Sequence, residues 1–106
     1  MTGPEFAVWI SKIYNPISVK YDIPLDIAHA MALSGYMHLA TATEASLEGA
    51  RLKMNSNVQT WFKIWTLYGK AHNITEDRIH NILMEIQKPI IDFLTQTAES
   101  VFRGRS

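Results

Sequence analysis

Residues 75–102 read TEDRIHNILMEIQKPIIDFLTQTAESVF, and this stretch decides the fold class. Thr75, followed by Glu76 and Asp77, is typical of a helix N-cap with two acidic residues in the first turn. At about 100° per residue, one set of apolar side chains falls within roughly 60° of a single direction: Ile79, Ile82, Leu83, Ile86, Ile90, Phe93, Leu94 and Val101. Most of the charged side chains lie on the opposite side. We therefore expect an amphipathic helix over residues 76–102, kinked at Pro89.

The N-terminal part shows the same helical periodicity. Residues 4–14 carry Phe6, Trp9, Ile10, Ile13 and Tyr14 at the spacing of one helix face. We expect this helix to end at Asn15, because a residue that precedes proline is pushed out of the α region. Residues 16–23 read PISVKYDI and are interpreted as an extended connection.

The middle of the chain has no proline between Leu25 and Lys70. We expect a long central helix that begins after Pro24 and bends near residues 55–57, where the sequence reads NSN. Its first part is rich in alanine, which allows another helix to approach closely. The sequence therefore predicts an all-α fold, a small bundle of three to four helices forming one domain over residues 1–106.

Composition excludes several classes of protein. Apolar residues make up 47% of the 106 residues and charged residues 19%, which is too apolar for a disordered chain. Lys plus Arg and Asp plus Glu both number ten, so the cationic excess typical of nucleic-acid binding is missing. We expect no nucleic-acid partner.

The chain contains no Cys, which excludes disulfides, thiol catalysis and cysteine-held clusters, and favours a reducing, cytoplasmic location. No Lys or Arg precedes Lys12, so the cationic start of a secretory signal is missing. The longest run without charged side chains, residues 27–43, contains two histidines and is shorter than the about 20 apolar residues of a spanning helix. We expect no transmembrane segment.

A metal site is one candidate for chemistry. His72, Glu76 and His80 follow one another at intervals of four residues, which places an imidazole–carboxylate pair on one helix face. Bundle metal sites need further ligands from facing helices, and no Glu-x-x-His pair occurs. Ordinary surface histidines are the stronger interpretation, so we expect no metal and no cofactor. The sequence also lacks a nucleophile elbow and a phosphate-binding loop, and we expect no enzymatic activity.

The segment at residues 61–68, WFKIWTLY, is the most informative for function. Its apolar side chains sweep roughly 220° of a helical wheel, whereas a surface helix buries a stripe a little over 100° wide. Either the helix lies buried between two neighbours, or it exposes an aromatic patch that binds a partner. The candidate binding residues are Trp61, Phe62, Ile64, Trp65, Leu67 and Tyr68.

The C-terminal helix carries a second apolar shoulder beside its main face. Met84, Ile91 and Phe102 lie on it and complete the set of candidate binding residues. Two helices with surplus apolar surface favour self-association, so we expect a homo-oligomer.

One stretch resembles a known family. Tyr21-Asp22-Ile23-Pro24, an Ala- and Thr-rich helix, and then Ser46-Leu47-Glu48-Gly49-Ala50-Arg51 are similar to the phasins, small helical proteins that coat polyhydroxyalkanoate granules. The resemblance covers about residues 16–60. It implies a non-enzymatic helical amphiphile that binds a hydrophobic polymer surface. The alternative is a helical adaptor or regulatory subunit that binds a protein partner through residues 61–68.

Overall fold

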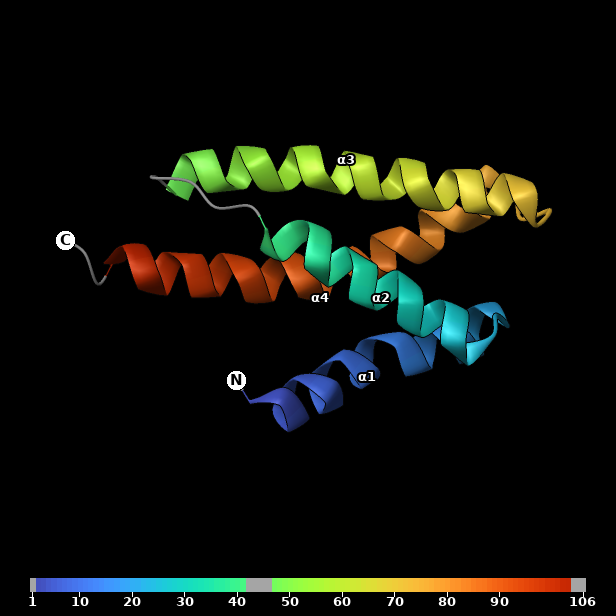
Figure 1. Ribbon diagram of the computed structural model, residues 1–106, viewed down its shortest axis with the longest axis horizontal. Coiled ribbons are helices and arrows are strands. Elements are labelled where there is room, and N and C mark those ends of the chain that lie inside the picture. The colour runs from blue at the N-terminus through green and yellow to red at the C-terminus, as the bar shows by residue number, and fades with distance from the viewer. Residues whose placement is uncertain (1, 42–46, 104–106) are drawn as a thin grey trace.

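The computed structural model describes residues 2–41 and 47–103, with the side chains in these ranges except those of residues 47, 50, 98 and 101–103. This part of the chain forms four helices, α1 (Gly3–Tyr21), α2 (Leu25–Ala40), α3 (Leu47–Ala71) and α4 (Glu76–Arg103) (Figure 1). The prediction of an all-α helical bundle is confirmed.

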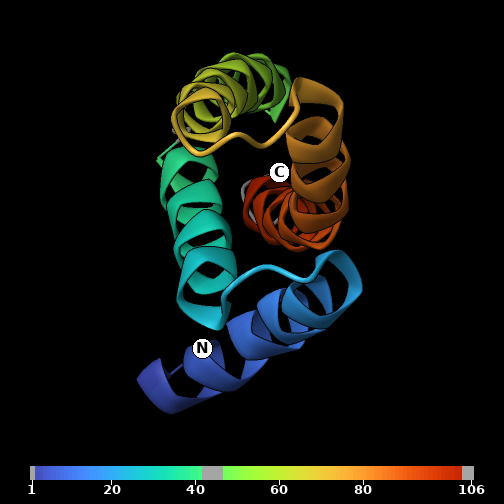
Figure 2. The same ribbon diagram turned by 90° about the vertical axis from the view of Figure 1, so that its right-hand side faces the viewer.

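The four helices form a slab that measures 49 × 28 × 17 Å along its principal axes. α2 and α4 pack against each other and against both remaining helices, whereas the described residues of α1 and α3 make no contact with each other. Viewed end-on, α2 lies on one broad side of the slab and α4 on the other, and α1 and α3 close its two edges (Figure 2). The core therefore lies between α2 and α4.

α1 begins with a reciprocal cap. The hydroxyl oxygen of Thr2 accepts a hydrogen bond from the backbone N–H of Glu5 at 3.2 Å and donates one to the Glu5 carboxylate at 3.0 Å. Pro4 occupies the first turn, where its missing N–H costs no helical hydrogen bond.

The predicted end of α1 at Asn15 is wrong. The helix continues through Pro16 to Tyr21, so the expected extended connection over residues 16–23 is helical for most of its length. Ile10, Ile13 and Ile17 are buried at helical spacing on both sides of the proline. Packing of this continuous apolar face outweighs the lost backbone hydrogen bond of one proline.

The predicted bend near residues 55–57 is also wrong, because these residues lie within α3. The long central helix is instead two helices, since α2 ends at Ala40 and α3 begins at Leu47. The Asn57 side-chain amide donates a hydrogen bond to the backbone carbonyl of His38 at 2.7 Å. The Thr41 hydroxyl donates to the same carbonyl at 2.9 Å, so Asn57 helps to satisfy the end of α2 and remains helical itself.

α1 and α3 end in the same way. Asp22 (φ 52°) and Asn73 (φ 59°) both adopt the left-handed conformation that closes a helix. The next residues then bond back, from Ile23 N–H to Ser18 O at 3.1 Å and from Ile74 N–H to Gly69 O at 2.8 Å. Pro24 is the N-cap of α2.

α2 and α4, the helices that follow these two turns, bury side chains at the same positions along their length. Counted from these two turns, α2 and α4 place their buried residues at identical intervals: Ala28, Met31, Ala32, Gly35 and Leu39 in α2, and Ile79, Ile82, Leu83, Ile86 and Ile90 in α4. The chain thus folds as two helical hairpins, α1–α2 and α3–α4, whose second helices face each other.

The sequence prediction for α4 is confirmed. The Thr75 hydroxyl accepts a hydrogen bond from the Arg78 N–H at 3.3 Å, and Pro89 lies inside the helix. α4 changes direction along its length in Figure 1, as expected for an internal proline.

A polar cluster fixes the end of α1 to α4. Glu85 accepts hydrogen bonds from the Lys20 ammonium and from the Tyr21 hydroxyl, the latter at 2.9 Å, and Arg78 donates to the Tyr21 carbonyl. The hydrogen bond from Lys20 lowers the pKa of Glu85 below 4.5 and raises the pKa of Lys20 above 10.5.

Glu85→Gln tests this cluster. A lowered carboxyl pKa contributes stability that is present above pH 4.5 and lost as pH falls through the lowered pKa. We expect the variant to melt at a lower temperature than wild type at pH 7, with the difference closing as the pH falls through the lowered pKa of Glu85. Thermal unfolding from pH 3 to 8 measures this. Asp92→Asn, an exposed change on the same helix, is the control, and a difference independent of pH would contradict the assignment.

Candidate functional site

The two tryptophans of α3 lie in the core. Trp61 and Trp65 are buried, and their indole N–H groups both donate to the Ser34 hydroxyl of α2, at 3.1 and 3.0 Å. Ser34 in turn donates to the carbonyl of Met31 at 3.0 Å. The prediction that Trp61 and Trp65 form a binding surface is wrong, because α2 packs directly over them.

Two further aromatic residues of the segment are half-buried. Phe62 turns towards α4, with its ring centroid 5.5 Å from that of His80. The ring centroid of Tyr68 lies 5.1 Å from that of Trp65 and 4.0 Å from that of His72. The wide apolar sweep of residues 61–68 is therefore largely covered by two neighbouring helices, as the buried alternative predicted.

Ile64 and Leu67 remain at the surface, with 46% and 58% of their area exposed. Phe62 is rotated from Trp61 towards α4, whereas Ile64 and Leu67 are rotated in the opposite sense. They therefore lie on the broad side of the slab that carries α2.

The two flanks of α2 are covered by its neighbours. On one flank, Ser34 bonds to the tryptophans of α3 and the His38 carbonyl accepts from Asn57. On the other flank, Tyr36 contacts Phe6 of α1 with ring centroids 4.7 Å apart. Only the side of α2 that lies opposite its buried row is left to face outward.

This outer side of α2 continues the surface formed by Ile64 and Leu67. It carries Ala30, Leu33 and Met37, of which Leu33 is half-buried and Met37 is 60% exposed. α2 has no Asp, Glu, Lys or Arg after its first turn. We call these three residues together with Ile64 and Leu67 the α2–α3 face.

The opposite broad side, formed by the outer side of α4, is polar. Asn81, Lys88 and Asp92 project there and are exposed. The slab thus has one broad side whose central helix is uncharged beyond Asp26 in its first turn, and one broad side with a charged helix.

The predicted shoulder of α4 is divided. Ile91 is half-buried against the core, because the α3 side of α4 is covered. Met84 is 55% exposed and lies away from the α2–α3 face. The Phe102 side chain lies outside the described residues.

The histidines do not converge on a metal site. His72 stacks on Tyr68 and its Nδ1 lies 2.9 Å from the Tyr68 carbonyl, whereas His80 lies between Phe62 and Glu76, 3.8 Å from that carboxylate. In the described ranges, no group of three or more His, Cys, Asp or Glu side chains is placed to hold a metal ion.

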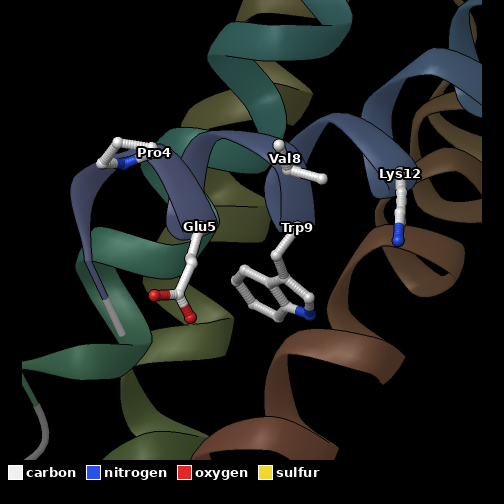
Figure 3. Close-up of a pocket in the computed structure, with 5 residues that line it drawn as sticks. All are labelled: Pro4, Glu5, Val8, Trp9 and Lys12. Atoms are coloured by element: carbon white, nitrogen blue, oxygen red, sulfur yellow. The ribbon is translucent and has the colours of Figure 1, made fainter.

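The outer side of α1 carries an open hollow of about 370 Å³. Its lining comes from α1 alone, namely Pro4, Glu5, Val8, Trp9 and Lys12 (Figure 3). Trp9 is half-buried against Phe93 of α4, with ring centroids 4.8 Å apart. Val8 is 56% exposed.

The sequence predictions missed the α2 half of the α2–α3 face and the hollow on α1. A signal for the α2 half was present in the run without charged side chains at residues 27–43. A signal for the hollow on α1 was the spacing of Glu5, Val8 and Lys12, which lie on the helix side opposite the buried isoleucines.

No protein-family model, no curated protein and no solved structure matches this chain. Among the described residues, none of the helices has the length and apolar character needed to span a bilayer.

Proposed function

We propose that the protein is a non-catalytic helical amphiphile that binds a hydrophobic surface through the α2–α3 face. The difference between the two broad sides of the slab supports this proposal. One side presents Met37, Ile64 and Leu67 around a helix whose one acidic residue, Asp26, lies in its first turn, and the other presents charged residues of α4 to water. Burial of a few hundred Å² of apolar area contributes several kcal/mol at about 25 cal/mol per Å², before the costs of association.

The surface implied by the phasin resemblance is a polyhydroxyalkanoate granule in the cytoplasm. A slab that is 17 Å thick can lie flat on such a polymer. The α2–α3 face would then cover the polymer, and the broad side formed by α4 would remain in contact with water. Adsorption in this form keeps Trp61 and Trp65 inside the bundle.

Met37→Asp tests the proposal. A charge at the centre of the α2–α3 face would have to be desolvated on adsorption, so we expect most co-sedimentation with polyhydroxyalkanoate particles to be lost. Met84→Asp is the matched control, since it places the same change at a methionine of similar exposure on α4. Circular dichroism verifies that both variants are folded. Equal sedimentation of wild type and Met37→Asp would refute adsorption through this face.

A protein partner is the second candidate, in which the chain acts as an adaptor or regulatory subunit. The small side chain of Ala30 lies beside Leu33 and the flexible Met37, a combination that would admit a partner helix into apolar contact. This candidate predicts no sedimentation with polymer particles. It also predicts that a photo-crosslinker at position 37 captures one defined protein in native cells, and that a crosslinker at position 84 does not.

A further inference from the structure

The outer side of α1 is a second surface that the α2–α3 face does not include. α1 forms one edge of the slab, and its described residues make no contact with those of α3 (Figure 2). Its inner side carries the buried isoleucines, so the side that bears Glu5, Val8 and Lys12 faces outward. These residues recur at intervals of three and four, the spacing with which one helix packs along another.

The charges on this side are arranged symmetrically. Glu5 and Lys12 lie two helical turns apart, about 10 Å along the axis, and the midpoint between them falls between Val8 and Trp9. Lys12 forms no ion pair with any described residue, and Glu5 bonds only to the Thr2 cap that begins its own helix. Glu5, Trp9 and Lys12 point to the same side of α1 in Figure 3.

Such an arrangement is complementary to itself. If two copies of α1 lie antiparallel about a two-fold axis at this midpoint, Glu5 of each copy faces Lys12 of the other. Val8 of each copy then meets the hollow beside Trp9 of the other, and every contact is made twice. A purely acidic partner would place a like charge against Glu5, and a purely basic partner would place one against Lys12.

We propose that α1 is a homodimer interface in which two copies of this chain pair antiparallel through Glu5, Val8, Trp9 and Lys12. Equal numbers of basic and acidic residues, ten each, mean that two copies have no net charge to overcome on approach. The paired segments are short compared with a standard interface of about 1,600 Å², so the dimer is weak and dissociates on dilution and in high salt.

Charge reversal tests the pairing. Sedimentation equilibrium should show wild type rising from 12.1 kDa towards twice this mass with concentration at low ionic strength. Glu5→Lys and Lys12→Glu should each weaken the homodimer by about tenfold or more, because like charges then face each other. An equimolar mixture of the two variants should recover dimer, and so should the double variant, because both combinations restore opposite charges at each contact.

The control is Lys63→Glu, which reverses an exposed lysine on α3 and should leave dimerisation unchanged. Recovery in the mixture also shows that the single variants are folded. A wild-type protein that stays monomeric at about 1 mM, where even a weak interface of this size should be occupied, overturns the proposal. So does a dimer that tolerates both reversals, which would place the contact elsewhere, for example on the α2–α3 face. Particle binding by Met37→Asp is measured separately. Failure of the α1 homodimer can therefore be told apart from failure of adsorption through the α2–α3 face.

Discussion

Ser34→Ala is expected to lower the free energy of unfolding by about 2–4 kcal/mol, because it removes an acceptor that two buried donors share. The Ser34 hydroxyl accepts the indole N–H groups of both Trp61 and Trp65, at 3.1 and 3.0 Å. Alanine would leave both donors without a partner in a buried site, and each unsatisfied group costs about 1–3 kcal/mol. Urea unfolding followed by tryptophan fluorescence measures the loss.

The matched control for this variant is Ser11→Ala. Ser11 also donates to a backbone carbonyl three residues earlier, that of Val8 at 2.7 Å, but its hydroxyl accepts no indole N–H. We expect this change to cost well under 1 kcal/mol, as is usual at a surface site. If the two serine variants lost similar amounts of unfolding free energy, the hydrogen bonds from Trp61 and Trp65 to Ser34 would contribute nothing beyond the effect of replacing a helical serine.

Gly35→Ala is expected to destabilise the protein by about 1–3 kcal/mol, the usual cost of overpacking a core. A Cβ atom at this position would lie 2.8 Å from Cζ2 of Trp61, too close for a non-bonded contact. Helix propensity alone predicts the opposite sign, a gain of about 1 kcal/mol for alanine over glycine. The sign of the change in unfolding free energy therefore decides whether the Trp61 ring is held rigidly against α2.

Gly3→Ala provides the comparison. A Cβ at Gly3 would meet nothing within 4 Å, so the helical preference of alanine is unopposed. We expect this variant to equal or exceed wild type in stability. A stabilising effect of Gly35→Ala would mean that the indole can shift, and would contradict the tight α2–α3 contact.

Sequence reasoning predicted α4 well because one strong periodic pattern covers the whole helix. Its cap at Thr75 and its buried row from Ile79 to Ile90 are both local properties of the chain. The end of α1 was predicted wrongly because Pro16 disfavours a helix locally, whereas tertiary packing favours one. Burial of Ile13 and Ile17 on either side of the proline decides the outcome, and only the fold reveals it.

The same distinction applies to the candidate site. The wheel of residues 61–68 correctly indicated that one neighbour could not cover it, but it could not assign each side chain to a neighbour or to water. That assignment depends on Ser34, an acceptor on another helix at a distance of about thirty residues. Ile64 and Leu67 are the apolar side chains of the segment that lie exposed at the surface.

Because α2 and α4 each bury the same row of positions, each supplies the apolar covering that the other requires. The α1–α2 half alone would leave much of the row on α2 in contact with water, and the α3–α4 half would do the same with α4. Turns and caps can form early, since they are local. Stability comes only when the two halves meet, so we expect the chain to unfold in a single cooperative transition, with no half persisting by itself.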